Sequence, residues 1–289
     1  MPDPTTSPGA LLRSVRPPSH DWLYYRIHVT DPEAADRLLE RLVAPMMRTL
    51  QQEVPGLRWF FLRFLDPTGL HVRLRLQAEQ QALNACERRL DAALAAGRQD
   101  QPGLFESSGK FLYAPEVHKY GPGAGMQLAE ELFQASSEMA VSCLGERHRA
   151  NRVGYGAAHM KVLLAGLPAQ QRPAFVHQYA WYWSGGPLTT GQAAKPRFAR
   201  TDARAAAQAS RLASQVERAL ADPATRAALE LFAARFWTAM EGRERQAGTG
   251  SDYYLLFHHM HLTNNRLGVF PGVEAALARL MWLSADRLC

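Results

Sequence analysis

The chain has 289 residues, of which 47% are hydrophobic and 21% charged, a composition typical of a globular protein with a sizeable core rather than of a disordered chain. Its 33 lysines and arginines exceed its 27 acidic residues, but the net charge of +6 comes without the dense basic runs of a dedicated nucleic-acid binder. Three cysteines are too few for a disulfide framework, and no apolar stretch is long enough for a secretory signal or a transmembrane helix, so we expect a cytoplasmic protein.

The first half of the chain carries strand patterns separated by helix patterns. Residues 1–20, rich in proline, serine and threonine, are interpreted as a flexible tail. Aromatic and β-branched runs predict four strands, at residues 22–29, 58–65, 70–76 and 110–114. The middle two strands are joined by the turn sequence Asp66-Pro67-Thr68-Gly69 and form a hairpin. With the helices between them, this order predicts an α+β fold that begins with a ferredoxin-like (βαββαβ) sheet subdomain over residues 21–120.

Helices are predicted between the strands and throughout the second half of the chain. The first is predicted from a capping box at Thr30–Glu33 to about residue 53, with a kink at Pro45, and the second over residues 79–96. Residues 121–289 are dominated by alanine and leucine and predict a helical subdomain that completes one compact unit. Its helices are predicted near residues 123–143, 147–165, 170–183, 202–221, 223–242, 251–267 and 272–286, with a long loop at 184–200.

The second strand of the hairpin, Leu70–Leu76, concentrates positive charge. Because side chains alternate along a strand, His71, Arg73 and Arg75 share one face, and the aliphatic residues of this strand share the other. Guanidinium groups match carboxylates and phosphates, so this face is a candidate anion-binding surface. The alternative is a solvated sheet face that binds nothing.

The segment Tyr113–Gly121 directly follows the last predicted strand. Pro115 and Gly121 mark it as a turn or short loop, in which Glu116 and Lys119 are spaced to meet on one helical turn. Loop residues held by a rigid sheet are common binding positions. The alternative is a surface ion pair that contributes less than about 1 kcal/mol, and this alternative is favoured unless the strand arginines point to the same place.

The stretch Asp252–Gly268 gathers three histidines, two asparagines and an arginine in one predicted helix. Histidine titrates near neutral pH, which makes it a natural proton donor or acceptor. His258 and His261 have the chemistry of metal ligands, but no carboxylate or cysteine lies at the spacing of a zinc motif, so no metal is expected. The alternative for each histidine is a structural role in the core or an interface.

Six stretches of the chain follow one another in a fixed order from Trp22 onward. They are WLYYRIHV from Trp22, LVAP from Leu42, RWFFLRFLDPTGLHVRLRL from Arg58, YAPEVHKYG from Tyr113, AEELFQASSE from Ala129 and HLTNNRLG from His261. Together they resemble the C-terminal domain of class I lantibiotic dehydratases and the stand-alone proteins of thiopeptide-type bacteriocin biosynthesis. The resemblance covers nearly the whole chain from Trp22.

The resemblance implies an enzyme that acts on ribosomally made precursor peptides. In this family a separate domain or protein uses glutamyl-tRNA to esterify a Ser or Thr side chain with glutamate. The domain resembled here then eliminates the glutamate and leaves dehydroalanine or dehydrobutyrine, which makes it a lyase. Its elimination residues, carried onto this sequence, are Arg73, Arg75, Glu116, Lys119 and His261.

Two features refine this set of residues. Lys119 stands where the family usually has arginine, so the charge is kept and the bidentate fork is lost. His261 is the candidate for proton transfer, because elimination needs a base for a weakly acidic Cα proton. Four neighbouring residues are substrate-binding candidates, namely His71, Tyr113, Asn265 and Arg266.

The same resemblance predicts the partners and leaves other functions open. The expected partners are the precursor peptide and the glutamyl-tRNA-dependent glutamylating protein, with no direct nucleic-acid or membrane contact and no cofactor. The active unit is a homodimer or a complex with that protein, and the sequence does not decide between them. One alternative is a pyridine synthase that joins two dehydroalanines by a [4+2] aza-cycloaddition and releases the leader peptide. Another is a non-catalytic scaffold that binds the precursor peptide.

Overall fold

The structure is a computed structural model, and it describes residues 21–184, 194–243 and 251–284. The predicted tail at 1–20 and most of the predicted loop at 184–200 lie outside these residues. The strands are β1 Asp21–His28, β2 Arg58–Asp66, β3 Gly69–Ala78 and β4 Ser107–Phe111. The helices are α2 Pro32–Leu38, the π-helix η1 Leu39–Val43, α3 Ala44–Glu53, α4 Gln80–Asp100, α5 Val117–Tyr120, α6 Ala124–Cys143, α7 Glu146–Ala150, α8 Arg152–Leu164, α9 Arg172–Trp183, α10 Ala194–Ala221, α11 Pro223–Gly242, α12 Asp252–Arg266 and α13 Pro271–Leu283. Within the described ranges, no helix has the length and apolar character needed to cross a membrane.

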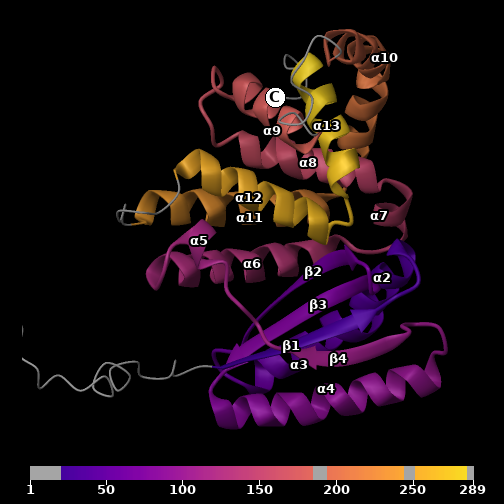
Figure 1. Ribbon diagram of the computed structural model, residues 1–289, viewed down its shortest axis with the longest axis vertical. Coiled ribbons are helices and arrows are strands. Elements are labelled where there is room, and N and C mark those ends of the chain that lie inside the picture. Colours follow the sequence, from indigo (N-terminus) through magenta and orange to yellow (C-terminus); the bar gives the residue numbers. More distant parts are fainter. Residues whose placement is uncertain (1–20, 185–193, 244–250, 285–289) are drawn as a thin grey trace, which may run out of the picture.

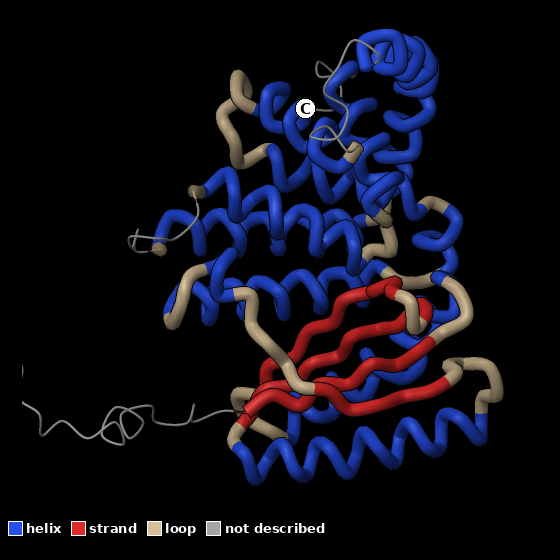
Figure 2. The backbone as a smooth tube through the Cα atoms, viewed as in Figure 1, coloured by secondary structure: helices blue, strands red, loops and turns tan. Residues whose placement is uncertain are grey.

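The four strands form one antiparallel sheet in the order β2-β3-β1-β4, drawn in red in Figure 2. Helix α4 runs along one face of the sheet, below it in Figure 1, and α6 lies on the opposite side. Helices α11 and α12 lie beyond α6, and α8, α9, α10 and α13 complete the helical half. The structure therefore confirms an α+β fold with a small antiparallel sheet and mostly helices.

Strand β3 shows how a charged strand fits between these layers. Val72, Leu74 and Leu76 are fully buried and belong to the apolar core, against α2 and α4. The alternating residues Arg73 and Arg75 turn to the other face, as predicted, and line a cleft together with side chains of the helical half. The sheet thus buries one face in the core and turns its arginines toward the second half of the chain.

Side chains of the helical half close the outer edge of β2. Ser137 of α6 accepts a hydrogen bond from the Phe61 N–H at 3.2 Å. Asn265 of α12 makes two bonds with one residue, since its Oδ1 accepts from the Arg63 N–H at 2.9 Å and its Nδ2 donates to the Arg63 carbonyl at 2.7 Å. These bonds satisfy backbone groups that an edge strand would leave unpaired, and they fix α6 and α12 against the sheet.

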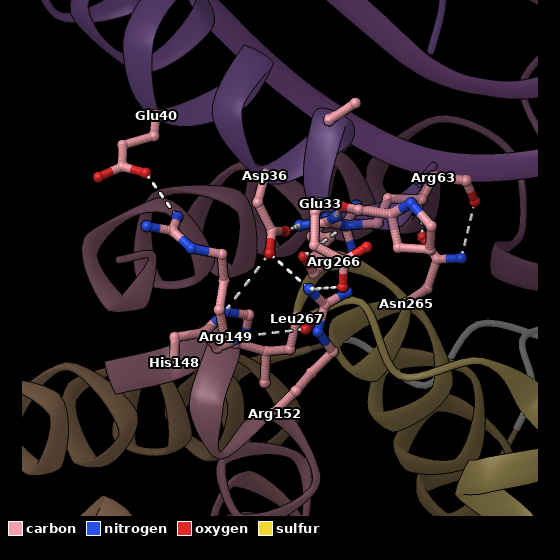
Figure 3. Close-up of polar contacts among 12 residues, drawn as sticks. Glu33, Asp36, Glu40, Arg63, His148, Arg149, Arg152, Asn265, Arg266 and Leu267 are labelled. Carbon is pink, nitrogen blue, oxygen red and sulfur yellow. Dashed lines mark hydrogen bonds and ion pairs between the residues drawn. The ribbon is translucent and has the colours of Figure 1, made fainter. Parts of the chain in front are cut away.

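A buried ion cluster joins the two halves and is shown in Figure 3. Asp36 of α2 is fully buried and pairs at 2.6 Å with both Arg63 of β2 and Arg152 of α8. His148 of α7 lies 3.9 Å from Asp36 and donates from Nε2 to the Leu267 carbonyl at 2.9 Å. Burial lowers the pKa of His148 to about 4, so its ring is neutral near pH 7. The two guanidinium groups are balanced by Asp36 together with Glu33, which lies 3.6 Å from Arg152.

The first helical segment differs in detail from the prediction. The kink expected at Pro45 corresponds to the π-helical turn η1, which ends two residues before the proline. Proline lacks an N–H and crowds the carbonyl four residues earlier, and the wider π turn accommodates both defects. The predicted capping box is wrong: the N-cap is Asp31, which accepts from the Ala34 N–H at 2.7 Å, while the Thr30 hydroxyl donates to Asp31.

Several other helix and strand boundaries also differ from the predicted ones. Helix α4 continues through Gly97, which packs closely against Leu42. Strand β4 begins at Ser107, earlier than the predicted strand at 110–114. Pairing with β1 draws Ser107 and its polar neighbours into a strand that their local propensity does not favour. The helix predicted at 147–165 is divided between α7 and α8 at Asn151, and α10 begins at Ala194, inside the predicted loop.

Candidate active site

A cleft of about 750 Å³ lies between the arginine face of the sheet and the helical half. Residues of β2, β3, α6, α9 and α12 line it, together with the connection between β4 and α6 and the beginning of α13. The cleft brings together seven of the nine predicted site residues, namely Arg73, Arg75, Tyr113, Glu116, Lys119, His261 and Asn265. Segments far apart in the sequence therefore meet at one place.

Arg73 lies in the wall of the cleft beside the hairpin turn. Its guanidinium carbon is 3.3 Å from the ring centroid of Phe64, and its Nε donates to His71 Nε2 at 3.1 Å. The nearest carboxylate oxygen, on Asp66, is 3.7 Å away, which is longer than a hydrogen bond. Burial lowers the pKa of Arg73, but arginine stays protonated in proteins. The side chain therefore remains a cation with donor capacity for a ligand in the cleft.

Arg75 is surrounded by aromatic rings. Its guanidinium carbon lies 4.6, 5.2 and 4.8 Å from the ring centroids of Tyr24, Phe60 and Tyr113. The residue is 8% exposed, and its Nε has no hydrogen-bond partner among the described residues. Burial lowers its pKa, which reflects the cost of a desolvated cation. Because Arg75 lines the cleft, its positive charge can interact with an anionic group bound there.

Glu116 and Lys119 meet as their spacing predicted. The Lys119 Nζ lies 2.6 Å from Glu116 Oε1 at the start of α5, and both residues line the cleft with partly exposed side chains. Because the strand arginines line the same cleft, the pair is more than an isolated surface contact. Glu116 is the one carboxylate among the described lining residues, against the cations Arg73, Arg75 and Lys119 and the Asp36-paired Arg63, so the cleft is positively charged.

Two histidines of α12 line the cleft in different surroundings. The ring of His261 stacks on Trp183, with centroids 4.0 Å apart, and its Nδ1 lies 2.8 Å from Glu274 Oε2. The ring of His258 packs against Tyr254, and burial lowers the pKa of His258 to about 4, so it is neutral near pH 7. Over the ranges that the structure describes, no group of three or more histidine, cysteine or acidic residues is arranged to hold a metal ion.

His71 and Arg266, two predicted substrate-binding residues, do not line the cleft. Both are fully buried: His71 contacts Arg73, and Arg266 donates from Nε to Ser137 Oγ at 3.0 Å. Burial lowers the pKa of Arg266 to about 9. Asn265 does line the cleft, but both ends of its amide bind the β2 backbone. In this structure these three residues hold the walls of the cleft, and a direct contact with substrate stays a prediction.

Sequence reasoning missed three residues of this region. Glu274 is fully buried in α13 beside buried Leu277. The sequence signal that could have identified Glu274 is an acidic residue on the apolar face of a predicted helix. Trp183 ends α9, and no spacing in the sequence connects it with His261. Glu130 of α6 is 5% exposed and accepts from the Tyr113 hydroxyl at 3.3 Å, and burial raises its pKa to about 7.

Comparison with known proteins identifies relatives over almost the whole chain. The family described as "Lantibiotic biosynthesis dehydratase C-term" matches residues 22–285. The subtilin biosynthesis protein SpaB of Bacillus subtilis is 27% identical over 135 residues, which are 47% of this chain and 12% of SpaB. The chain therefore matches only a small part of that protein's length.

Two solved structures share the fold. The tRNA-dependent lantibiotic dehydratase MibB from Microbispora sp. 107891 superimposes with a TM-score of 0.59 and 22% identity, over 95% of this chain and 29% of MibB. TsrL superimposes with a TM-score of 0.62 and 16% identity, over 92% of this chain and 95% of TsrL. At these identities the likeness concerns the fold, and the chain spans less than a third of MibB.

Proposed function

The chain belongs to the family of lantibiotic biosynthesis dehydratase C-terminal domains, and from this premise we propose that it eliminates glutamate from glutamylated Ser or Thr side chains of a ribosomally made precursor peptide. The products would be dehydroalanine and dehydrobutyrine, and the reaction makes the protein a lyase. The observation that carries the proposal is the meeting of Arg73, Arg75, Glu116 and His261, from three separate segments, in one positively charged cleft.

The charge of the cleft fits the electron flow of such an elimination. The electron pair of the Cα–H bond becomes the Cα=Cβ double bond, and the pair of the Cβ–O bond leaves with glutamate as a carboxylate. Negative charge develops on the amide carbonyl beside Cα and on the leaving carboxylate, and fixed cations stabilise both. In this proposal Arg73 and Arg75 supply that stabilisation, since both are cations that line the cleft and Arg73 is 3.7 Å from its nearest carboxylate oxygen.

The remaining residues take proposed roles around the two arginines. His261 accepts the Cα proton, because its ring lines the same cleft. Glu116 orients an arginine or the ammonium group of the glutamyl moiety, and Lys119 adds positive charge near the leaving glutamate. Tyr113, whose ring faces Arg75, is the substrate-binding candidate that the cleft geometry supports best.

We also propose how this unit is organised and what it works with. The precursor peptide is its substrate, and a glutamyl-tRNA-dependent protein or domain supplies the glutamate ester. Residues 21–120 and 121–289 form the two subdomains, and the strand order with antiparallel pairing supports a ferredoxin-like assignment of the first. The cleft between the subdomains uses residues of both.

Mass spectrometry of two peptide reactions tests the proposal. The protein is incubated with a glutamylated precursor peptide and, separately, with a fully dehydrated linear peptide. We expect the first peptide to lose the mass of glutamic acid and the second to stay unchanged. If the protein ignores the glutamylated peptide but cyclises the dehydrated one, the [4+2] cycloaddition replaces elimination. If it binds both peptides and changes neither, it is a precursor-binding scaffold.

A further inference from the structure

A buried carboxylate lies directly behind the cleft histidine. Glu274 of α13 is 0% exposed, and its Oε2 is 2.8 Å from His261 Nδ1. Its other oxygen, Oε1, accepts from Asn264 Nδ2 at 3.0 Å and from the Tyr179 hydroxyl. Three helices therefore contribute groups to one carboxylate: α9 through Tyr179, α12 through His261 and Asn264, and α13 through Glu274 itself.

The hydrogen bonds determine the orientation of the His261 ring. An ionised carboxylate only accepts hydrogen bonds, so the 2.8 Å contact fits an Nδ1–H that donates to Glu274. Stacking on Trp183, with 23° between the two ring planes, restrains rotation of the imidazole. Because Nδ1 is turned to Glu274 and the ring lines the cleft, Nε2 is the nitrogen left for a group in the cleft.

His258 provides an internal comparison. It lines the same cleft three residues earlier on α12, but its ring contacts are aromatic, with Tyr254, Phe257 and Tyr120. Burial and the nearby Lys119 both disfavour its charged form. A carboxylate on Nδ1 has the opposite effect, since it stabilises an imidazolium and makes the other nitrogen a better proton acceptor.

We infer that Glu274 is a positioning residue that holds His261 in its Nδ1-protonated tautomer and stabilises the charged ring, so that His261 rather than His258 is the proton acceptor of the cleft. The inference rests on the proposed elimination for the identity of the proton, which is the Cα proton of the glutamylated residue. In the step, Nε2 takes that proton and the imidazolium charge is balanced by Glu274. The electron pair left on Cα forms the double bond as glutamate departs.

The other charged and titratable groups near His261 do not duplicate this pairing. Tyr179 of α9 donates to Glu274, and Glu116 and Lys119 pair with each other on the α5 side of the cleft. His258 is on the same helix and is neutral near pH 7. A substitution of Glu274 should therefore change the protonation of His261 more than that of the other groups in the cleft.

The first test measures His261 without any substrate. In protein labelled with ¹⁵N-histidine, we expect His261 to show the Nδ1-protonated pattern, and its titration midpoint should move at least one pH unit lower in Glu274→Gln, a tenfold or greater loss of proton affinity. Glutamine keeps an acceptor for Nδ1 and removes the charge. Glu130→Gln, the same change at another buried glutamate, is the matched control and should leave the His261 signals in place.

The second test follows glutamate release by Glu274→Gln over a range of pH. We expect kcat to fall by about 10²-fold or more, in the range of general-base catalysis, while KM changes by less than threefold. The acid limb of the profile should move to lower pH, because a weaker base is protonated only at lower pH. A purely structural role of Glu274 would not move that limb.

The two tests separate the inference from the proposed function. If His261 titrates identically in wild type and Glu274→Gln, the pairing is refuted whatever the protein catalyses. If the midpoint moves but wild type releases no glutamate, elimination is refuted and the pair stands as the proton acceptor for another reaction. If both the midpoint and the acid limb move together, the inference holds.

Discussion

The sheet half, residues 21–120, and the helical half, the described residues from 121 onward, contribute to the cleft by different physical means. The sheet presents Arg73 and Arg75 on alternate positions of β3, where the strand period alone fixes the face. The helical half presents His261, whose orientation depends on Glu274, Trp183 and other side chains distant in sequence. The two strand arginines are thus placed by local geometry, whereas the proposed base is placed by tertiary contacts. Perturbations of the two halves should therefore have different consequences.

The largest effect is expected where the halves are joined. Asp36→Ala leaves the buried Arg63 without its carboxylate and removes a 2.6 Å pair with Arg152. Breaking a buried pair from one side destabilises by about 3–5 kcal/mol, because an unpaired charge remains in the core. Urea unfolding measures the loss. The control is Glu40→Ala, which removes the partly exposed pair with Arg149 in Figure 3 and should cost less than about 1 kcal/mol.

Equal effects of the two substitutions would contradict this account of the junction. Asp36→Ala could also unfold the protein completely, and Arg63→Met with Asp36→Ala then gives a second measurement. The double variant removes both charges from the interior, so it should recover much of the lost stability. No recovery would mean that the cluster contributes through something other than paired charge.

The sheet half should govern catalysis through charge, with the next largest effect. Arg75→Met keeps the apolar stem among the rings of Tyr24, Phe60 and Tyr113 and removes the guanidinium. We expect glutamate release to fall by about 10²–10³-fold, the usual cost of one lost charge-stabilising donor, with peptide binding largely intact. Arg58→Met is the matched control, since Arg58 lies on the same face of the sheet, in the neighbouring strand β2, but pairs with Glu131 outside the cleft.

Strand period and turn chemistry were enough to predict most of the sheet half. Alternation placed Arg73 and Arg75 together, the turn at Asp66–Gly69 gave the hairpin, and the i,i+3 spacing of Glu116 and Lys119 produced the observed contact. The error at β4 shows where this reasoning stops. Ser107 and its neighbours become a strand because β1 offers an unpaired edge, and such tertiary pairing leaves no local pattern.

The helical half could be predicted as elements but not as a site. Most helix positions followed from apolar period and turn signals, yet the partners of His261 did not. Glu274 follows it by 13 residues and Trp183 precedes it on another helix, and both contacts arise from packing rather than spacing. The resemblance to a family led to His261 itself, while the physical environment of the ring required the structure.

A pH-dependent effect of intermediate size on stability is expected at Glu130, which accepts a hydrogen bond from the cleft residue Tyr113. Burial raises the pKa of Glu130 from 4.5 to about 7. Between these pH values the unfolded chain ionises this group and the folded protein keeps it protonated, so the carboxyl destabilises the fold increasingly as pH rises. Glu130→Gln removes this pH-dependent destabilisation and keeps an acceptor for Tyr113.

Thermal unfolding at two pH values measures this effect. We expect Glu130→Gln to be more stable than wild type at pH 8, by on the order of 2 kcal/mol, and close to wild type at pH 4.5. The reference is Glu131→Gln, a neighbouring exposed residue, which should show no comparable change with pH. A stability gain that is the same at both pH values would mean that folding does not raise the pKa of Glu130.

The smallest effect is expected at Lys119 on the α5 side of the cleft. Lys119 places a compact ammonium 2.6 Å from Glu116, at the position where the family resemblance leads us to expect the planar guanidinium of arginine. If Lys119 acts by its charge, Lys119→Arg should change kcat for glutamate release by less than about threefold, whereas Lys119→Met should lower it by tenfold or more. If instead the site needs two parallel donors, Lys119→Arg should raise the rate well above wild type. Both variants alter a partly exposed side chain, so unfolding midpoints near that of wild type show that a change in rate reports the chemistry of the cleft rather than the stability of the fold.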